Sequence, residues 1–246
     1  MGSLTYFPNR FAAGSARVGA NSGSDSPNRA HPVQWPPQQI TLLDISIDPM
    51  NLSSRQYWIF DLDGTLTHPI HNFEAIRAEI GVPKGLPILE YLDEMPMGTS
   101  ELLHAELHAI EHDLASRATR PDGVLELLVH LRERGAQLGI VTRNSRDIAY
   151  QTLEACGLDG IFAADAVIGR EQAEPKPEPD GIHLLLSGWG AAPNEAVMVG
   201  DFLYDLQAGR AAGTATVYVD SSGEFPWASY ADRSVEQLDW LITDLI

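Results

Sequence analysis

Four aspartates, a threonine and a lysine occur in this sequence beside short apolar segments, where their side chains could act on one bound group. The acids come in two close pairs, and each pair follows an apolar run typical of a buried strand. The threonine ends another such run, and the lysine lies between two prolines. Each feature alone is common on protein surfaces, so their joint order indicates a site. The residues are Asp61, Asp63, Thr142, Lys176, Asp201 and Asp205.

The chemistry of this set favours a metal ion and a phosphate. Carboxylates that converge repel one another and are hard to keep ionised without a cation. Carboxylate oxygens suit Mg²⁺, which keeps water molecules that a substrate phosphate can replace. The ammonium of Lys176 and the hydroxyl of Thr142 suit the charge of that phosphate. We therefore expect Mg²⁺ as the cofactor and a small phosphorylated substrate as the partner.

The segments that carry these residues alternate between predicted strands and helices from Gln56 onward. Strands of a parallel sheet are buried on both faces, and ligands bind beyond their carboxyl ends. The pattern predicts an α/β fold with a Rossmann-like parallel sheet. The predicted strands are 57–60, 138–142, 166–168, 196–201 and 215–219.

Residues 68–118 interrupt this alternation because their pattern predicts helices only. We expect them to form a small helical cap that is inserted after the first strand. Residues 50–67 and 119–246 would then form the core domain, whose last helix we expect over 235–245.

Local signals predict the ends of the cap helices. Asn72 suits the N-cap of a first helix, and Gly81 suits its end. Pro87 suits the first turn of a second helix that runs to about residue 95. Thr99 or Ser100 suits the N-cap of a third.

The composition limits the classes of function. The chain has 246 residues, of which 44% are hydrophobic, which suffices for one core with a small insert. Its formal net charge of −18 disfavours nucleic acid and anionic membranes as partners. No apolar run is long enough to span a membrane. The single cysteine, Cys156, suits a cytoplasmic location, and the sequence indicates no oligomeric state.

Residues 1–49 differ from the rest in being rich in Gly, Ser, Ala, Asn and Pro. We expect a disordered extension there. Arginines without acids before Asp25 weakly resemble an organelle transit peptide. Met50 directly precedes the folded pattern and is an alternative start of the natural protein.

In their order, the motifs resemble those of haloacid dehalogenase-like (HAD) hydrolases. The resemblance is to subfamily I with a C1-type helical cap, which includes phosphoglycolate-phosphatase-like members. The first motif is DLDGTLT at 61–67, and the second is the strand that ends in Thr142. The third is KPEPDGI at 176–182, and the fourth is VGDFLYD at 199–205. The resemblance covers about 56–235 and implies a Rossmann-like core with phosphoaspartyl chemistry.

The resemblance also implies a role for each residue of the set. Asp61 would be the nucleophile. Asp63 would be the general acid that protonates the leaving oxygen and then the base that activates water. Thr142 and Lys176 would hold the transferring phosphoryl group. Mg²⁺ would be bound by Asp61, the carbonyl oxygen of Asp63, Asp201 and, directly or through water, Asp205.

Four further residues are expected to bind substrate. Gly64 lets the backbone approach the phosphate closely, and Thr65 follows it in the first motif. Arg143 and Asn144 follow the threonine of the second motif. Arg143 either meets a second anionic group of the substrate or pairs with an acid of the protein.

These residues favour a Mg²⁺-dependent phosphatase, and two alternatives stay open. A haloacid dehalogenase would not need Asp63, because a halide leaves without a proton. A phosphomutase of the same superfamily would share the core residues. A non-catalytic metabolite-binding module is less consistent with the sequence, because all six residues of the set are present.

Three histidines of the cap, His104, His108 and His112, share one face of the predicted third helix. Such spacing can bind Zn²⁺, and one of them could contact substrate when the cap closes. We favour a polar face beside the apolar stripe of that helix.

Overall fold

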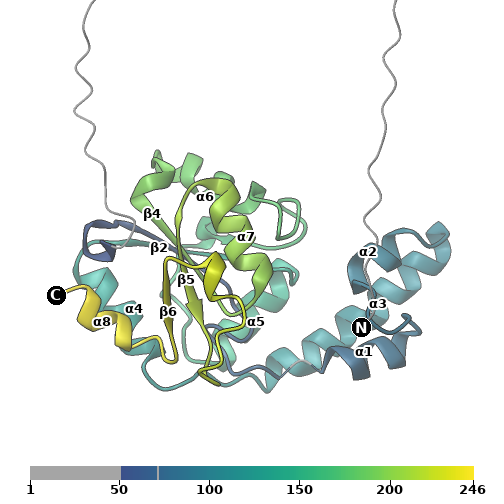
Figure 1. Cartoon of the computed structure of the whole chain (residues 1–246). Coiled ribbons are helices and arrows are strands. Elements are labelled where there is room, and N and C mark those ends of the chain that lie inside the picture. The colour runs from purple at the N-terminus through teal and green to yellow at the C-terminus, as the bar shows by residue number, and fades with distance from the viewer. Residues whose placement is uncertain (1–50, 71) are drawn as a thin grey trace, which may run out of the picture. The chain divides into compact units, whose positions relative to one another are not determined.

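Strands and helices alternate through most of the chain in the computed structural model, which describes residues 51–70 and 72–246 (Figure 1). The predicted extension over 1–49 lies outside the described residues. All the described residues belong to a single compact unit. None of the helices in this part of the chain combines the length and apolar character that crossing a bilayer requires.

Six parallel strands form one sheet in the order β3-β2-β1-β4-β5-β6. The strands are β1 (Tyr57–Phe60), β2 (Gln137–Val141), β3 (Val167–Ile168), β4 (Ala196–Gly200), β5 (Ala215–Val219) and β6 (Arg233–Val235). Because β1 lies between β2 and β4, the strand order reverses there, and such a reversal opens a crevice at the carboxyl ends. The predicted α/β fold with a Rossmann-like parallel sheet is confirmed.

Helices cover both faces of this sheet (Figure 1). Alternate residues of β1 face opposite sides, as the pleat requires: Trp58 and Phe60 join one buried cluster and Ile59 the other. The first cluster includes residues of α4 (Val124–Glu133), α5 (Arg146–Ala155) and α8 (Trp240–Asp244). The second includes residues of α6 (Asp180–Trp189) and α7 (Leu203–Ala212). Short 3₁₀ turns occur at Leu52–Ser54, Ala164–Ala166, Pro193–Glu195 and Ala228–Tyr230.

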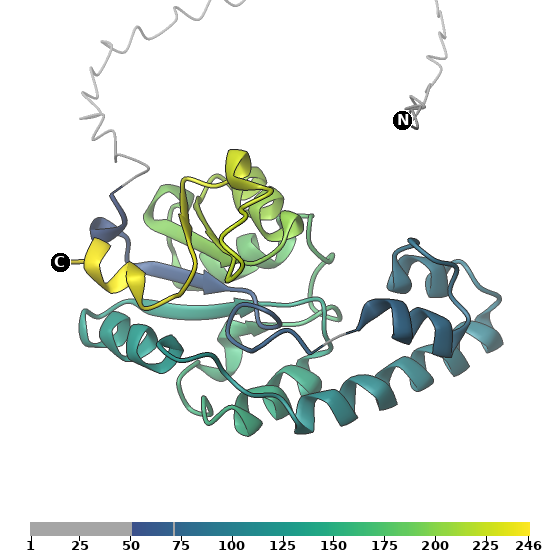
Figure 2. The same ribbon diagram turned by 60° about the horizontal axis from the view of Figure 1, so that its bottom comes forward.

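Three helices lie between β1 and α4, as predicted for 68–118 (Figure 2). They are α1 (Phe73–Ile80), α2 (Ile88–Asp93) and α3 (Met97–Ser116). They share a buried apolar cluster of their own, built around Ile76, Leu92 and Leu107. Helix α3 also reaches the core, where Gln151 of α5 donates to the carbonyl of His112 over 3.2 Å.

Two helix starts differ from the prediction. Helix α3 begins at Met97, earlier than a Thr99 or Ser100 cap would place it. The carbonyl of Pro96 accepts from the backbone of both residues, at 2.8 and 2.9 Å, so no side-chain cap is needed. Helix α2 has Pro87 as its N-cap rather than in its first turn, and it ends at Asp93.

The predicted last helix over 235–245 is wrong at its start. Residues Arg233–Val235 form β6, which pairs with β5 at the edge of the sheet, and α8 begins only at Trp240. Val235 is buried because it pairs with Val219 and joins the core, and its apolar character gave no helical signal of its own.

Candidate active site

The residues predicted from the sequence meet beyond the carboxyl ends of β1, β2 and β4. Phe60, the last residue of β1, pairs with Ile140 of β2 and Val199 of β4, so these strands end at nearly the same level. The backbone N–H of Asp61 continues the ladder by donating to Val199 over 2.9 Å. The register therefore brings together residues that lie far apart in the chain.

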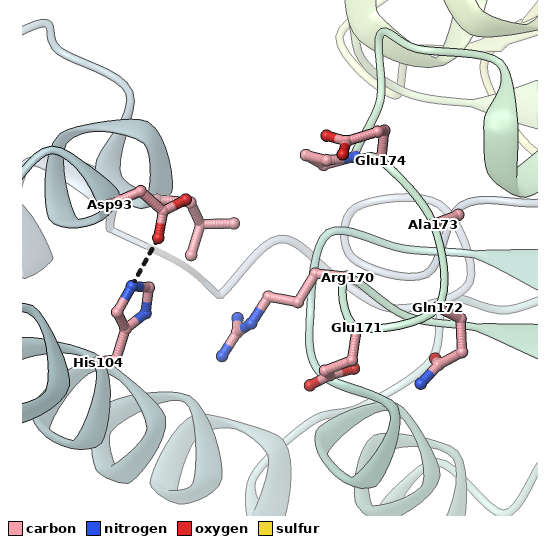
Figure 3. A pocket seen from close by; sticks show the side chains of 9 residues that line it. Asp93, His104, Arg170, Glu171, Gln172, Ala173 and Glu174 are labelled. Carbon is pink, nitrogen blue, oxygen red and sulfur yellow. Dashed lines mark hydrogen bonds and ion pairs between the residues drawn. The ribbon is translucent and has the colours of Figure 1, made fainter.

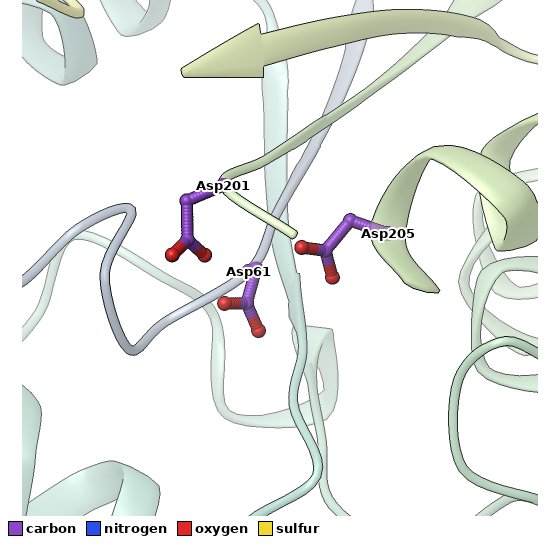
Figure 4. Close-up of side chains that lie close together, drawn as sticks. All are labelled: Asp61, Asp201 and Asp205. Carbon is purple, nitrogen blue, oxygen red and sulfur yellow. The ribbon is translucent and has the colours of Figure 1, made fainter. Parts of the chain in front are cut away.

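Three of the aspartates form a tight cluster (Figure 4). Asp61, Asp201 and Asp205 each offer a carboxylate oxygen, and these oxygens lie within 4.8 Å of one another. Asp205 is held in the first turn of α7, where its other oxygen accepts from the backbone of Phe202 over 3.0 Å. Three converging oxygen donors of this kind suit a hard divalent cation such as Mg²⁺. The donor set thus fits the predicted metal.

The ammonium of Lys176 is buried against this cluster. It lies 2.7 Å from Oδ1 of Asp205 and also contacts Asp61. Burial alone would lower the pKa of this ammonium, but the charges of Asp205 and Asp61 raise it above its usual value. Lys176 is therefore a permanent cation beside the candidate nucleophile.

The turn after β1 makes room for Asp201. Gly64 has φ +86°, and a Cβ there would lie 2.2 Å from Oδ2 of Asp201. The next residue, Thr65, donates from its hydroxyl to the other oxygen of Asp201 over 3.2 Å. Both residues thus orient Asp201, so their contacts are to the cluster itself.

Asn144 lies beside Asp63 rather than beside the three-aspartate cluster. Its side-chain amide donates to Oδ2 of Asp63 over 2.5 Å, and its backbone N–H donates to the hydroxyl oxygen of Thr142 over 3.1 Å. Asn144 and Thr142 are both buried. The turn after β2 therefore connects two of the predicted catalytic residues.

Burial raises the pKa of three carboxyls in this crevice. Loss of solvation raises the pKa of Asp61 to about 7, with Lys176 opposing the shift, and that of Asp201 to about 8. Burial also raises the pKa of Asp63 to about 6, although the bond from Asn144 favours its ionised form. Such shifts are typical of sites that bind cations or transfer protons.

A cavity of about 340 Å³ opens over the cluster. Its walls come from the core and from α1, α2 and α3, and it is of a size that suits a small molecule. Arg143 lines it and lies 2.8 Å from Glu90 of α2, with its guanidinium 5.5 Å from the ring centre of Tyr204. Arg143 therefore pairs with an acid of the protein, one of the two alternatives that the sequence left open.

One ion pair at this site was not expected. Arg170 holds both oxygens of Glu111 at 2.8 and 2.9 Å, and Glu111 is 7% exposed. The pair joins α3 to the loop after β3, and the backbone N–H of Arg170 donates to Asn144 over 3.0 Å. No spacing in the sequence links residues that lie 59 positions apart.

A second cavity, of about 540 Å³, lies between α2, α3 and the loop at 170–175 (Figure 3). His104 bonds to Asp93 there over 2.9 Å, whereas His108 lies 3.4 Å from Asp147 of α5. The histidines therefore have separate acidic partners. Among the described residues, no group of potential metal ligands includes His104, His108 or His112. The polar-face interpretation fits these contacts.

Comparison with known proteins identifies similar chains. The profile of a family described as haloacid dehalogenase-like hydrolase matches residues 72–219. Pyrophosphatase PpaX of Bacillus pumilus is 34% identical over 187 residues, which cover 69% of this chain and 85% of the relative.

Two solved structures share the fold. A hydrolase from Pseudomonas syringae has a TM-score of 0.64 at 24% identity, with 78% of this chain and 97% of that chain covered. CbbY from Rhodobacter sphaeroides, in complex with phosphate, has a TM-score of 0.56 at 23% identity, with 78% and 99% covered.

Proposed function

The chain belongs to the haloacid dehalogenase-like hydrolase family, and from this premise we propose that it is a Mg²⁺-dependent phosphatase with a covalent intermediate on Asp61. It is an enzyme of the phosphatase type. The metal, the intermediate and the residue roles are the substance of the proposal. Its main support is the cluster of Asp61, Asp201 and Asp205, whose oxygens lie within 4.8 Å of one another.

In the first step, a carboxylate oxygen of Asp61 attacks the phosphorus of the substrate. The bond from phosphorus to the ester oxygen breaks, and Asp63 gives its proton to that oxygen. Asp63 suits this role because its pKa is raised to about 6, which keeps part of it protonated near neutral pH. The alcohol leaves, and the phosphoryl group stays on Asp61.

In the second step, Asp63 acts as a base. It takes a proton from a water molecule, whose oxygen attacks phosphorus, and the bond to Asp61 breaks. The products are the alcohol and inorganic phosphate, with one water consumed. Because Asn144 donates to Asp63, it holds this carboxyl in one position through both steps.

The charge of the phosphoryl group is balanced by groups of the protein. Lys176 supplies a fixed ammonium, and Thr142 supplies a hydroxyl. The ligands of Mg²⁺ would be Asp61, the carbonyl oxygen of Asp63, Asp201 and Asp205. When bound, this ion supplies positive charge for the phosphate and neutralises the converging carboxylates. Gly64, Thr65, Arg143 and Asn144 complete the surroundings of the substrate.

Residues 68–118 act as the cap in this proposal. The two chain segments that connect it to the core run side by side, because the backbone N–H of His68 donates to Thr119 over 2.8 Å. A cap over the cavity would exclude water from the phosphate, which strengthens the electrostatic contacts there. The cytoplasmic location remains a prediction from the sequence.

The test is phosphate release from a panel of small phosphate esters, with Mg²⁺ and with excess EDTA. We expect release that requires both the metal and Asp61, so that Asp61→Asn is inactive. Asp165→Asn is the matched control, because Asp165 is exposed and lies outside the cluster. Release that persists in Asp61→Asn would refute the proposal. A requirement for a bisphosphate activator would instead identify a phosphomutase.

A further inference from the structure

The part of the cavity beyond the catalytic cluster is walled by apolar side chains of the cap. Ile76 of α1 and Leu107 of α3 are buried there, and Ile88 and Leu89 of α2 are half-buried. Phe73, the first residue of α1, lines the same space and is 55% exposed. The cap therefore presents a hydrophobic surface to whatever is bonded to the phosphate.

The core contributes aromatic rings to the opposite wall. Phe202 and Tyr204 line the cavity, and their rings meet edge to face with centres 5.1 Å apart. Phe202 is 45% exposed, although it lies directly after the metal-site residue Asp201. Large apolar side chains that stay exposed on two sides of one cavity are typical of a binding surface.

The arginines that line this cavity are each balanced by an acid. Arg77 lies 3.1 Å from Glu74, and Arg143 lies 2.8 Å from Glu90. Each also donates to a backbone carbonyl, Arg77 to Leu86 and Arg143 to Lys176.

The remaining charged groups of the cavity outside the aspartates are also paired. Glu111 is held by Arg170, and Lys176 contacts Asp61 and Asp205. Among the described residues that line the cavity, every cation thus has a carboxylate partner. A leaving group with its own negative charge would have to break one of these pairs.

We propose that the substrate is a phosphate monoester of a neutral, apolar alcohol, with an aromatic or branched group that lies between Phe73 of the cap and Phe202 of the core. This inference rests on the proposed function, because it treats the cavity as the place of the leaving group. It separates the chain from the activity named for its pyrophosphatase relative, since the leaving group of pyrophosphate is an anion. It also disfavours phosphoglycolate, whose leaving group carries a carboxylate.

The test compares esters whose leaving alcohols have similar acidity. We expect kcat/KM for 2-phenylethyl phosphate to exceed that for ethyl phosphate, phosphoglycolate and pyrophosphate by at least about tenfold, because the ring is buried on binding. Equal values, or a higher value for either anionic substrate, would overturn the inference.

Two substitutions at one exposed position sharpen this test. Phe73→Ala should lower the ratio of kcat/KM for 2-phenylethyl phosphate over ethyl phosphate by at least about fivefold. Phe73→Arg should lower it further and raise kcat/KM for phosphoglycolate, because it adds a cation to the wall. Leu102→Ala, also an exposed apolar residue of the cap but outside the cavity lining, should leave the ratio unchanged. An unchanged ratio in both Phe73 variants would contradict the assignment.

A binding measurement keeps the two proposals distinguishable. If no ester is hydrolysed with dependence on Mg²⁺ and Asp61, the proposed function fails. Calorimetry with 2-phenylethylphosphonate and phosphonoacetate, which are not hydrolysed, then still decides the inference. Tighter binding of the phenylethyl compound, by at least about tenfold, supports it. Equal or weaker binding overturns it.

Discussion

Lys176 lies 2.7 Å from Asp205 in the interior of the protein, where neither side chain has a solvent shell. The pair joins the loop before α6 to the first turn of α7, and the same ammonium contacts Asp61. One cation thus serves two buried carboxylates, and a third, Asp201, lies in the same cluster.

Removal of this cation should cost both stability and activity. Lys176→Met leaves buried carboxylates without their partner, so we expect the metal-free protein to lose about 3–5 kcal/mol in the free energy of unfolding. We expect kcat/KM to fall by about 100-fold or more, because a charge that stabilises the phosphoryl group is lost. Denaturant titration and phosphate-release kinetics measure the two effects. Lys84→Met, at the only other lysine, should change neither, and loss of activity there would point to a general effect of removing charge.

A glycine without room for a side chain should control metal affinity. Gly64→Ala would press a methyl group against Asp201 at 2.2 Å, so we expect Mg²⁺ to bind at least about tenfold more weakly. The positive φ adds a backbone cost of about 1 kcal/mol. Gly135→Ala has nearly the same φ, +81°, with nothing within 4 Å of the added methyl, and is the matched control. Calorimetric titration should find weaker Mg²⁺ binding only in Gly64→Ala.

The alkaline limb of the pH–rate profile should depend on Asn144. Its amide stabilises the ionised form of Asp63, so Asn144→Ala should raise the pKa of Asp63 above its value of about 6. The acid form would then persist to higher pH, and the alkaline limb of kcat should shift in the same direction. Asn194→Ala, an exposed asparagine far along the chain, should not shift it. A limb that moves to lower pH in Asn144→Ala would be inconsistent with Asp63 as the acid.

The stability of the metal-free protein should fall as the pH rises. The pKa values of Asp61, Asp63 and Asp201 are raised from 3.8 to about 7, 6 and 8. Between these limits the folded protein therefore binds protons that the unfolded chain has released, and the free energy of unfolding decreases with pH.

Magnesium should reverse this trend because it binds the ionised carboxylates. We expect the rise in Tm on adding Mg²⁺ to be larger at about pH 8 than at about pH 5. Thermal unfolding with Mg²⁺ and with EDTA measures it, and Asp201→Asn should reduce the difference. A rise in Tm that is independent of pH would show that the ion does not bind these carboxylates.

The cap helices show how far local signals predict structure. Asn72 caps α1 as expected, with its side chain accepting from Ala75 over 3.1 Å, and Gly81 ends the helix with φ +75°. These features involve only neighbouring residues, so a short window of sequence contains the whole signal. Strand β6 contains only Arg233–Val235 and depends on pairing with β5, which no local pattern encodes.

The same distinction applies to the site. Asp61, Thr142 and Asp201 were predictable because each follows a buried strand, and a parallel sheet brings such ends together. Glu111 and Arg170 were not, because their ion pair depends on where α3 passes the loop after β3. The apolar wall of the cavity was likewise not predictable, since Phe73 and Phe202 meet one space only after the helices have packed.

Detection of a phosphoryl group on Asp61 tests the central claim most directly. Asp63→Asn lacks the base for the second step and should accumulate the intermediate when it is mixed with Mg²⁺ and a phosphate ester. After acid quenching and proteolysis, mass spectrometry should find one added phosphoryl group on the peptide that contains Asp61, and none with EDTA. A phosphoryl group on another residue, or none under conditions in which the wild type releases phosphate, would contradict the account.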